Sequence, residues 1–218
     1  AECVVESCYF EHCNGEGEII SNKSCDNIYR NNLFVGCEGA LTLRHGNNAQ
    51  VLNNYFLGNG ARLSGGVRII GEGHLVKGNY FSGLRGKTYC AIHLMQGQEE
   101  SPLWGYMQVK RAAISDNIFV DNHCCISVGG DKYKICTLPV IETTIENNTI
   151  TACEDDYSIV YRGANHDIRW RNNTICGGRQ VGVSLPEKRS LPKQPNIDRA
   201  VRQIRDNAGV KFINCNKN

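Results

Sequence analysis

The sequence predicts an all-β protein folded as a right-handed parallel β-helix, a solenoid with coils of about 22–25 residues. Two observations predict this fold. A short phrase of apolar residues around an asparagine recurs along the chain, and the Gly- and Asn-rich text between its copies lacks the 3.6-residue periodicity of helices.

The recurring phrase reads as a short strand followed by a sharp turn. Two of its copies are Val51-Leu-Asn-Asn54-Tyr-Phe56 and Ile114-Ser-Asp-Asn117-Ile-Phe119. Its last asparagine stands at positions 32, 54, 79, 117, 148 and 173, and Cys8 takes this place in an earlier copy. An inward-facing asparagine at each bend bonds to backbone groups of neighbouring coils, so we expect an asparagine ladder.

The spacing of the copies separates regular coils from insertions. From position 8 onward the steps are 24, 22, 25, 38, 31 and 25 residues. The two long steps predict loop insertions at about 85–110 and 129–140. A β-propeller or a β-sandwich is the alternative, but propeller blades repeat at about 40 residues or more, and sandwiches carry no fixed asparagine.

The text changes after residue 185, which divides the chain into two parts. Residues 1–185 are expected to form the β-helix, and 186–218 a proline-rich linker with a short helix packed on it. The helix is predicted over 197–206, because Ile197, Val201 and Ile204 recur at helical spacing.

Composition excludes several classes of protein. The net charge of +2 and the absence of aromatic residues within a basic motif argue against nucleic-acid binding. No apolar run approaches the roughly 18 residues of a membrane-spanning helix. The 12 cysteines contain no CxxC pair typical of zinc sites.

Three cysteines recur at a fixed place in the repeat. Cys13, Cys37 and Cys153 each stand five residues after the last asparagine of the phrase, or after Cys8 in the first copy. This spacing predicts buried thiols on one interior line, with a Cys13–Cys37 disulfide as the alternative.

Several cationic side chains recur one coil apart. Lys23, Arg44 and Arg68 are separated by 21 and 24 residues, and His45 follows Arg44. Residues one coil apart become lateral neighbours about 4.8 Å apart, so these side chains gather on one face. Clustered like charge destabilises a fold, which indicates a functional site for an anionic partner.

The motifs around these residues resemble those of a known family. They are Glu16-Gly-Glu-Ile-Ile-Ser-Asn-Lys-Ser24, Leu43-Arg-His-Gly-Asn47, Gly65-Gly-Val-Arg-Ile-Ile-Gly71 and Ser101-Pro-Leu-Trp-Gly-Tyr-Met-Gln-Val109. Together, and at one-coil spacing, they resemble polysaccharide lyase family 6, the β-helical alginate lyases and chondroitinase B type enzymes, and are most similar to the alginate lyases. The resemblance covers about residues 3 to 150.

The resemblance implies a lyase that cleaves alginate, a polymer of 4-linked uronates, by β-elimination. Lys23 would be the base that removes the C5 proton, and Arg44 the acid that protonates the departing O4. Arg68 would clamp the substrate carboxylate, with His45, Tyr106 and His74 as further substrate-binding residues. A lysine acts as a base only when neutral, and nearby positive charge favours that form.

Glu16 and Glu18 match positions at which family members hold Ca²⁺, a hard cation that prefers oxygen ligands. The family's asparagine ligand from the preceding coil, like its further N-terminal coils, would lie upstream of Ala1. The sequence therefore leaves calcium binding open. We expect either a fragment or a chain whose open N-terminal end pairs with another chain.

Two rival functions stay open. One is a lyase of the same mechanism that acts on dermatan or another glycosaminoglycan. The other is a β-helix that binds acidic glycans without cleaving them. A polymeric substrate implies a secreted or periplasmic protein, and the sequence leaves mannuronate or guluronate preference and endo or exo attack undecided.

Overall fold

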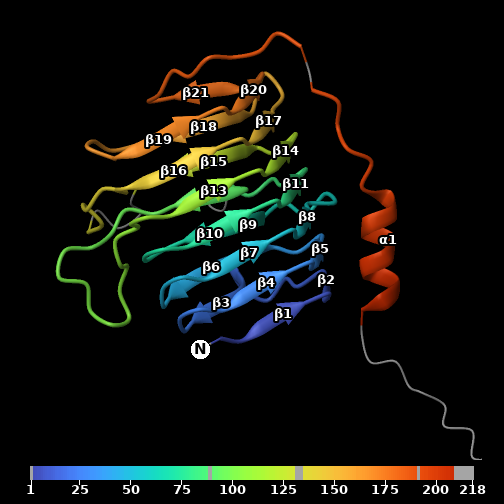
Figure 1. The fold of residues 1–218 in the computed structure, drawn as a ribbon, viewed down its shortest axis with the longest axis horizontal. Coiled ribbons are helices and arrows are strands. Elements are labelled where there is room, and N and C mark those ends of the chain that lie inside the picture. The colour runs from blue at the N-terminus through green and yellow to red at the C-terminus, as the bar shows by residue number, and fades with distance from the viewer. Residues whose placement is uncertain (1, 88–89, 131–134, 191, 209–218) are drawn as a thin grey trace, which may run out of the picture.

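The computed structural model describes residues 2–87, 90–130, 135–190 and 192–208. Three parallel sheets of seven strands run the length of the molecule, and successive strands of the chain enter the three sheets in turn (Figure 1). Each set of three strands is one coil, so the predicted parallel β-helix is confirmed.

The bounds of the strands follow the coil repeat. Sheet A contains β1 (Val4–Glu6), β4 (Ile28–Arg30), β7 (Gln50–Leu52), β10 (Leu75–Lys77), β13 (Ala113–Ser115), β16 (Thr143–Glu146) and β19 (Ile168–Arg171). Sheet B contains β2 (Tyr9–Glu11), β5 (Leu33–Val35), β8 (Tyr55–Leu57), β11 (Tyr80–Ser82), β14 (Ile118–Val120), β17 (Thr149–Thr151) and β20 (Thr174–Cys176). Sheet C contains β3 (Glu18–Lys23), β6 (Gly39–His45), β9 (Ser64–Ile69), β12 (Ile92–Leu94), β15 (Cys124–Val128), β18 (Tyr157–Tyr161) and β21 (Arg179–Val181).

The asparagine ladder fills the turn between sheets A and B. In each coil the ladder side chain accepts a bond from the backbone N–H of the corresponding residue one coil earlier. Asn79 Oδ1, for example, accepts from Asn54 N at 2.9 Å, and Asn79 Nδ2 donates to the Val51 carbonyl at 2.9 Å. The preceding residue of the turn has a positive φ, as in Asn53 (54°) and Asn147 (55°). The double asparagine is thereby explained, because asparagine tolerates this conformation better than most residues.

The core is built from the same repeat. Phe10, Phe34, Phe56, Phe81 and Phe119 stack through the interior with ring centroids 4.6–5.0 Å apart. Ile150 and Ile175 continue the line in the last two coils. Each coil thus contributes one large apolar side chain at the same register position, which accounts for the fixed phrase in the sequence.

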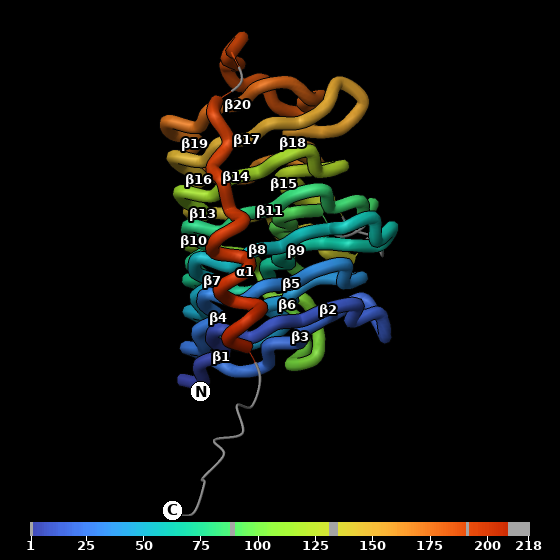
Figure 2. The backbone as a smooth tube through the Cα atoms, turned by 90° about the vertical axis from the view of Figure 1, so that its right-hand side faces the viewer, coloured from blue at the N-terminus to red at the C-terminus, as the bar shows by residue number. Residues whose placement is uncertain are grey.

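The helix and the loops agree with expectation in part. Helix α1 (Asp198–Asn207) lies beside sheet B near β5, with Ala200, Val201 and Ile204 half-buried (Figure 2). Among the described residues, no helix is long and apolar enough to cross a membrane.

The first insertion spans 95–112 rather than 85–110, because Ile92–Leu94 still pairs with β9 as part of sheet C. The division of the chain at 185 stays a prediction.

The cysteine line is confirmed only in part. Cys37 is buried and Cys13 packs against the core, and burial raises the pKa of the Cys37 thiol to about 11. The prediction that Cys153 is buried is wrong. Cys153 lies in the turn after β17, and its exposed thiol donates to the Asp121 carboxylate. All cysteines in the described part of the chain are free thiols, so Cys13 and Cys37 form no disulfide.

His74 belongs to the interior of the fold. Its side chain is fully buried in the turn before β10, where Nδ1 accepts from the Ala49 backbone N–H at 3.1 Å. Nε2 lies 2.9 Å from the Ile70 carbonyl, so the neutral ring with hydrogen on Nε2 satisfies both contacts. Burial lowers the pKa of His74 below its ordinary value of 6.5.

Replacing one ladder residue should destabilise the whole β-helix. Asn79→Ala leaves the buried Asn54 N–H and Val51 carbonyl without partners. Each such loss costs about 1–3 kcal/mol, so the free energy of unfolding should fall by about 2–4 kcal/mol in denaturant titration. Lys77→Ala, at an exposed position two residues earlier, is the control. Equal stability of the two variants would contradict a structural role for the ladder.

The buried histidine should make stability depend on pH. Because the folded state disfavours the charged ring, the unfolded chain binds more protons, and stability falls as pH drops below the ordinary value of 6.5. His74→Gln should lose part of the difference in unfolding free energy between pH 7.5 and pH 5. A variant with the unchanged wild-type difference would show that other groups cause the acid sensitivity.

Candidate functional site

The predicted cations meet at the ends of the sheet C strands. Lys23 ends β3, Arg44 and His45 end β6, and Arg68 lies within β9. They do not form one straight row, because a register shift between Asn22 and Lys23 pairs Lys23 with His45. Arg68 pairs instead with Thr42.

A loop from a distant part of the chain covers this cluster. The segment between β12 and β13, drawn in green in Figure 1, projects beside the strands of the earlier coils. Arg44 Nη2 donates to the Trp104 carbonyl at 3.2 Å, and His45 Nε2 lies 3.3 Å from the Gly105 carbonyl. The ring of Tyr106 faces the guanidinium of Arg44, with 4.3 Å from Cζ to the ring centroid.

Arg68 is held from two sides. Its Nη1 lies 3.6 Å from Glu18 Oε1, and its Nε lies 2.9 Å from the sulfur of Met95. The Tyr106 ring centroid is 5.6 Å from Arg68 Cζ, so one ring faces both arginines. Only 14% of the Arg68 side chain is exposed, which fixes the orientation of its positive charge.

Three buried polar atoms of this site have no hydrogen-bond partner within the described residues. They are Ser21 Oγ on β3 and Thr42 Oγ1 and Arg44 Nη1 on β6. Ser21 and Thr42 are paired neighbours across the two strands. Ser21 and Thr42 lie in the middle of their strands, and buried groups without partners are costly, so these three atoms are candidate contacts for a polar ligand.

Asn22, next to Lys23, is a part of the site that sequence reasoning missed. Its buried Nδ2 donates to the carbonyls of Ser24 and His45, at 3.0 and 2.9 Å. Its Oδ1 accepts from Asn27 Nδ2 and Tyr29 Oη. These bonds fix the bend that carries Lys23 against the end of β6. A polar residue at an inward position of a strand was the available signal.

The acidic residues offer only part of a metal site. Glu16 lies in the loop before β3 and Glu18 begins that strand, where it already contacts Arg68. Among the described residues, no group of three or more metal-ligating side chains comes together. Calcium takes 6–8 oxygen ligands, so these two carboxylates alone do not fit the ion and further oxygens would be needed.

The structure therefore gathers most, but not all, of the predicted site. Lys23, Arg44, His45, Arg68 and Tyr106 converge, and Glu18 joins them through Arg68. His74 does not, because it is enclosed in the interior with both ring nitrogens in contact with backbone groups. Its burial leaves no surface for a substrate.

Comparisons with known proteins place the chain in a family. The family model described as Chondroitinase B matches residues 1–214. The solved structure of the PL6 family alginate lyase AlyGC is 32% identical with a TM-score of 0.82, and the match covers 90% of this chain and 27% of that one. No match was found among curated proteins.

Two more distant structures share the fold. A mannuronic acid specific polysaccharide family 6 lyase from human gut microbiota is 22% identical, with a TM-score of 0.69 over 94% of this chain and 49% of that one. A PL6 alginate lyase in complex with a trisaccharide is 22% identical, with a TM-score of 0.65 over 88% of this chain and 47% of that one. The chain thus spans half or less of each relative's length. From the family match over nearly its full length, this chain belongs to the Chondroitinase B family, within polysaccharide lyase family 6.

Proposed function

We propose that this chain carries the catalytic site of a lyase that cleaves alginate by β-elimination. The observation that carries the proposal is the gathering of Lys23, Arg44 and Arg68 beside buried polar atoms that have no partner among the described residues. A uronate polymer presents a carboxylate beside each reacting C5, and this cationic site is complementary to it. The identity of 32% to an alginate lyase supports alginate as the substrate.

Each side chain has a role in the proposed reaction. Arg68, oriented by Glu18 and Met95, binds the carboxylate and stabilises the negative charge that develops beside C5. Lys23 Nζ takes the C5 proton, and the electron pair of that bond forms the C4–C5 double bond. The C4–O4 bond then breaks, and Arg44 donates a proton to O4. The unpartnered Arg44 Nη1 is the donor that a substrate oxygen would satisfy.

The carbonyls of the covering loop keep the acid and its neighbour in place. Arg44 and His45 are bonded to main-chain oxygens of Trp104 and Gly105. His45, opposite Lys23 across the strands, is placed to contact the sugar beside the base.

The product would carry an unsaturated uronate at its new non-reducing end. Alginate is a polysaccharide that an enzyme would encounter outside the cytoplasm, so the proposal includes a secreted or periplasmic location.

A glycosaminoglycan lyase of the same mechanism is the second candidate. The description of the matching family model, Chondroitinase B, favours it. Dermatan and alginate share the uronate carboxylate, so the same residues would act on either polymer. For calcium, Glu16 and Glu18 would supply only part of the 6–8 oxygen ligands, and no third metal-ligating side chain joins them among the described residues.

Removal of the base should abolish the reaction. With alginate, the wild type should produce ultraviolet absorbance from the conjugated enol ether, and Lys23→Ala should lose activity by at least about 10²-fold, the lower range for general base catalysis. Lys77→Ala on sheet A removes the same charge elsewhere and should retain the wild-type rate.

Parallel assays separate the alternatives. Product from dermatan but not alginate would support the second candidate, and binding of either polymer without product would support a non-catalytic glycan-binding protein. A rate lost on adding a chelator would show that a cation is needed besides Arg68. Full activity of Lys23→Ala would overturn the proposed role of the base.

The aromatic ring of Tyr106 should matter more than its packing volume. Its cation–π contacts, about 0.5–2 kcal/mol, help to hold Arg44 and Arg68, so Tyr106→Ala should lower kcat/KM by roughly 2- to 30-fold. Tyr106→Phe keeps the ring and should lose less than Tyr106→Leu. Equal rates for the leucine and phenylalanine variants would contradict this role.

A further inference from the structure

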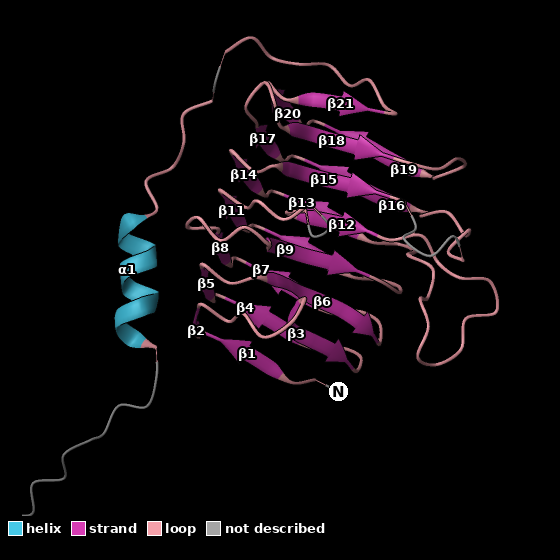
Figure 3. Ribbon diagram, turned by 180° about the vertical axis from the view of Figure 1, so that it is seen from behind, coloured by secondary structure: helices cyan, strands magenta, loops and turns pink. Residues whose placement is uncertain are grey.

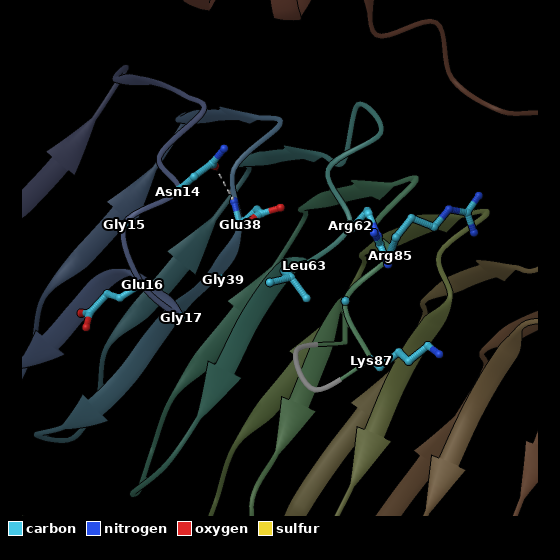
Figure 4. Close-up of a pocket in the computed structure, with 11 residues that line it drawn as sticks. Asn14, Gly15, Glu16, Gly17, Glu38, Gly39, Arg62, Leu63, Arg85 and Lys87 are labelled. Carbon is cyan, nitrogen blue, oxygen red and sulfur yellow. Dashed lines mark hydrogen bonds between the residues drawn. The ribbon is translucent and has the colours of Figure 1, made fainter.

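A large groove lies at the corner between sheets B and C. It is lined by the turns that precede β3, β6, β9 and β12, with Asn14–Gly17, Glu38–Gly39, Arg62–Leu63 and Arg85–Lys87 as its walls (Figure 4). Its volume of about 910 Å³ is within the range of small-molecule binding sites. We call it the corner groove.

The corner groove is separate from the reacting centre. It lies at the N-terminal ends of the sheet C strands, whereas Lys23 is the last residue of the six-residue strand β3. At about 3.3 Å per residue, the two ends of that strand are about 17 Å apart. A ligand in the groove would therefore be separated from Lys23 by about the length of β3, although Gly17 of its wall adjoins Glu18, the partner of Arg68.

Charges of opposite sign stand at opposite ends of the groove. Glu38 comes from an early coil, and Figure 4 shows its carboxylate extending toward the side of Arg62, while Glu16 points away. Arg62, Arg85 and Lys87 come from the next two coils. Arg85 is paired with Asp156 at 3.0 Å, but among the described residues neither Arg62 nor Lys87 forms an ion pair.

Apolar and bare backbone surfaces complete the lining. Leu63 stands between the charged ends with 58% of its surface exposed. Gly39 has φ +96°, and a Cβ there would lie 2.6 Å from the Gly17 carbonyl carbon, so only glycine allows these turns to stack closely. A Cβ on Gly15 would meet no atom within 4 Å, which shows that this wall opens onto free space.

One ligand chemistry uses all of these features. A uronate residue has a carboxylate for Arg62 and Lys87, hydroxyl groups that donate to Glu38, and an apolar ring face for Leu63. An inorganic anion would use only the cationic end. The lining comes from four successive coils, so the groove follows the stacking direction of the coils, which suits a chain of sugars.

We propose that the corner groove is a second binding site for acidic polysaccharide, which holds the polymer at a distance from the cleavage site. The choice of ligand rests on the proposed function, because the polymer that the enzyme cleaves is the acidic glycan it meets. A second contact in the corner groove should raise the affinity of the enzyme for long polymer without changing the rate of the chemical step.

The test is a double variant, Arg62→Ala with Lys87→Ala. Both side chains are exposed, so the fold should be kept. Loss of two charged contacts should weaken binding of long alginate at least about tenfold in calorimetry, measured in a Lys23→Ala background to prevent turnover. In the active background, KM for long polymer should rise while kcat, and all constants for a tetrasaccharide, stay unchanged.

The matched control is Arg169→Ala with Arg171→Ala, which removes two exposed charges from β19 on sheet A. Equal weakening by both double variants would attribute the effect to net charge and overturn the site, as would wild-type affinity in the groove variant. A neutral glucan should not bind in either protein. Absence of any cleavage by the wild type would sink the proposed function, whereas the calorimetric comparison would still decide the groove.

Discussion

Every feature of this molecule depends on hydrogen bonding between successive coils. A coil of three short strands has few contacts within itself, so its buried backbone groups find partners one coil away. At the A–B turn the chain bends between two strands, and side chains provide the partners of its backbone groups. The ladder asparagines supply both a donor and an acceptor there, and they tie each coil to its neighbours on both sides.

This regular stacking converts sequence distance into lateral distance and so assembles the site. Side chains from β3, β6 and β9 come together because each coil repeats with little variation, while the shift at Asn22–Lys23 turns the base toward His45. The regularity ends at the β12–β13 loop, whose backbone reaches back over the earlier coils. The scaffold thus fixes the cations, and one insertion orients them.

The fold could be predicted from the sequence because each position of the repeat requires a particular type of residue: apolar residues in the core and asparagine in the turn. The cation cluster followed from the same period. The register shift could not be predicted, since nothing in Asn22-Lys23 marks a bulge, and the loop carbonyls carry no side-chain signal at all. His74, a candidate for substrate binding in the sequence, has a structural role instead, because both its ring nitrogens contact backbone groups of the bend.

The way in which Arg44 is held has a consequence for how the site responds to its surroundings. Among the described residues, its partners are a main-chain carbonyl and the face of the Tyr106 ring, and it forms no ion pair with a carboxylate. An arriving carboxylate therefore displaces no anion of the described residues from this guanidinium. The whole positive charge of Arg44 is therefore available to the substrate, whereas Arg68 divides its charge between Glu18 and the substrate.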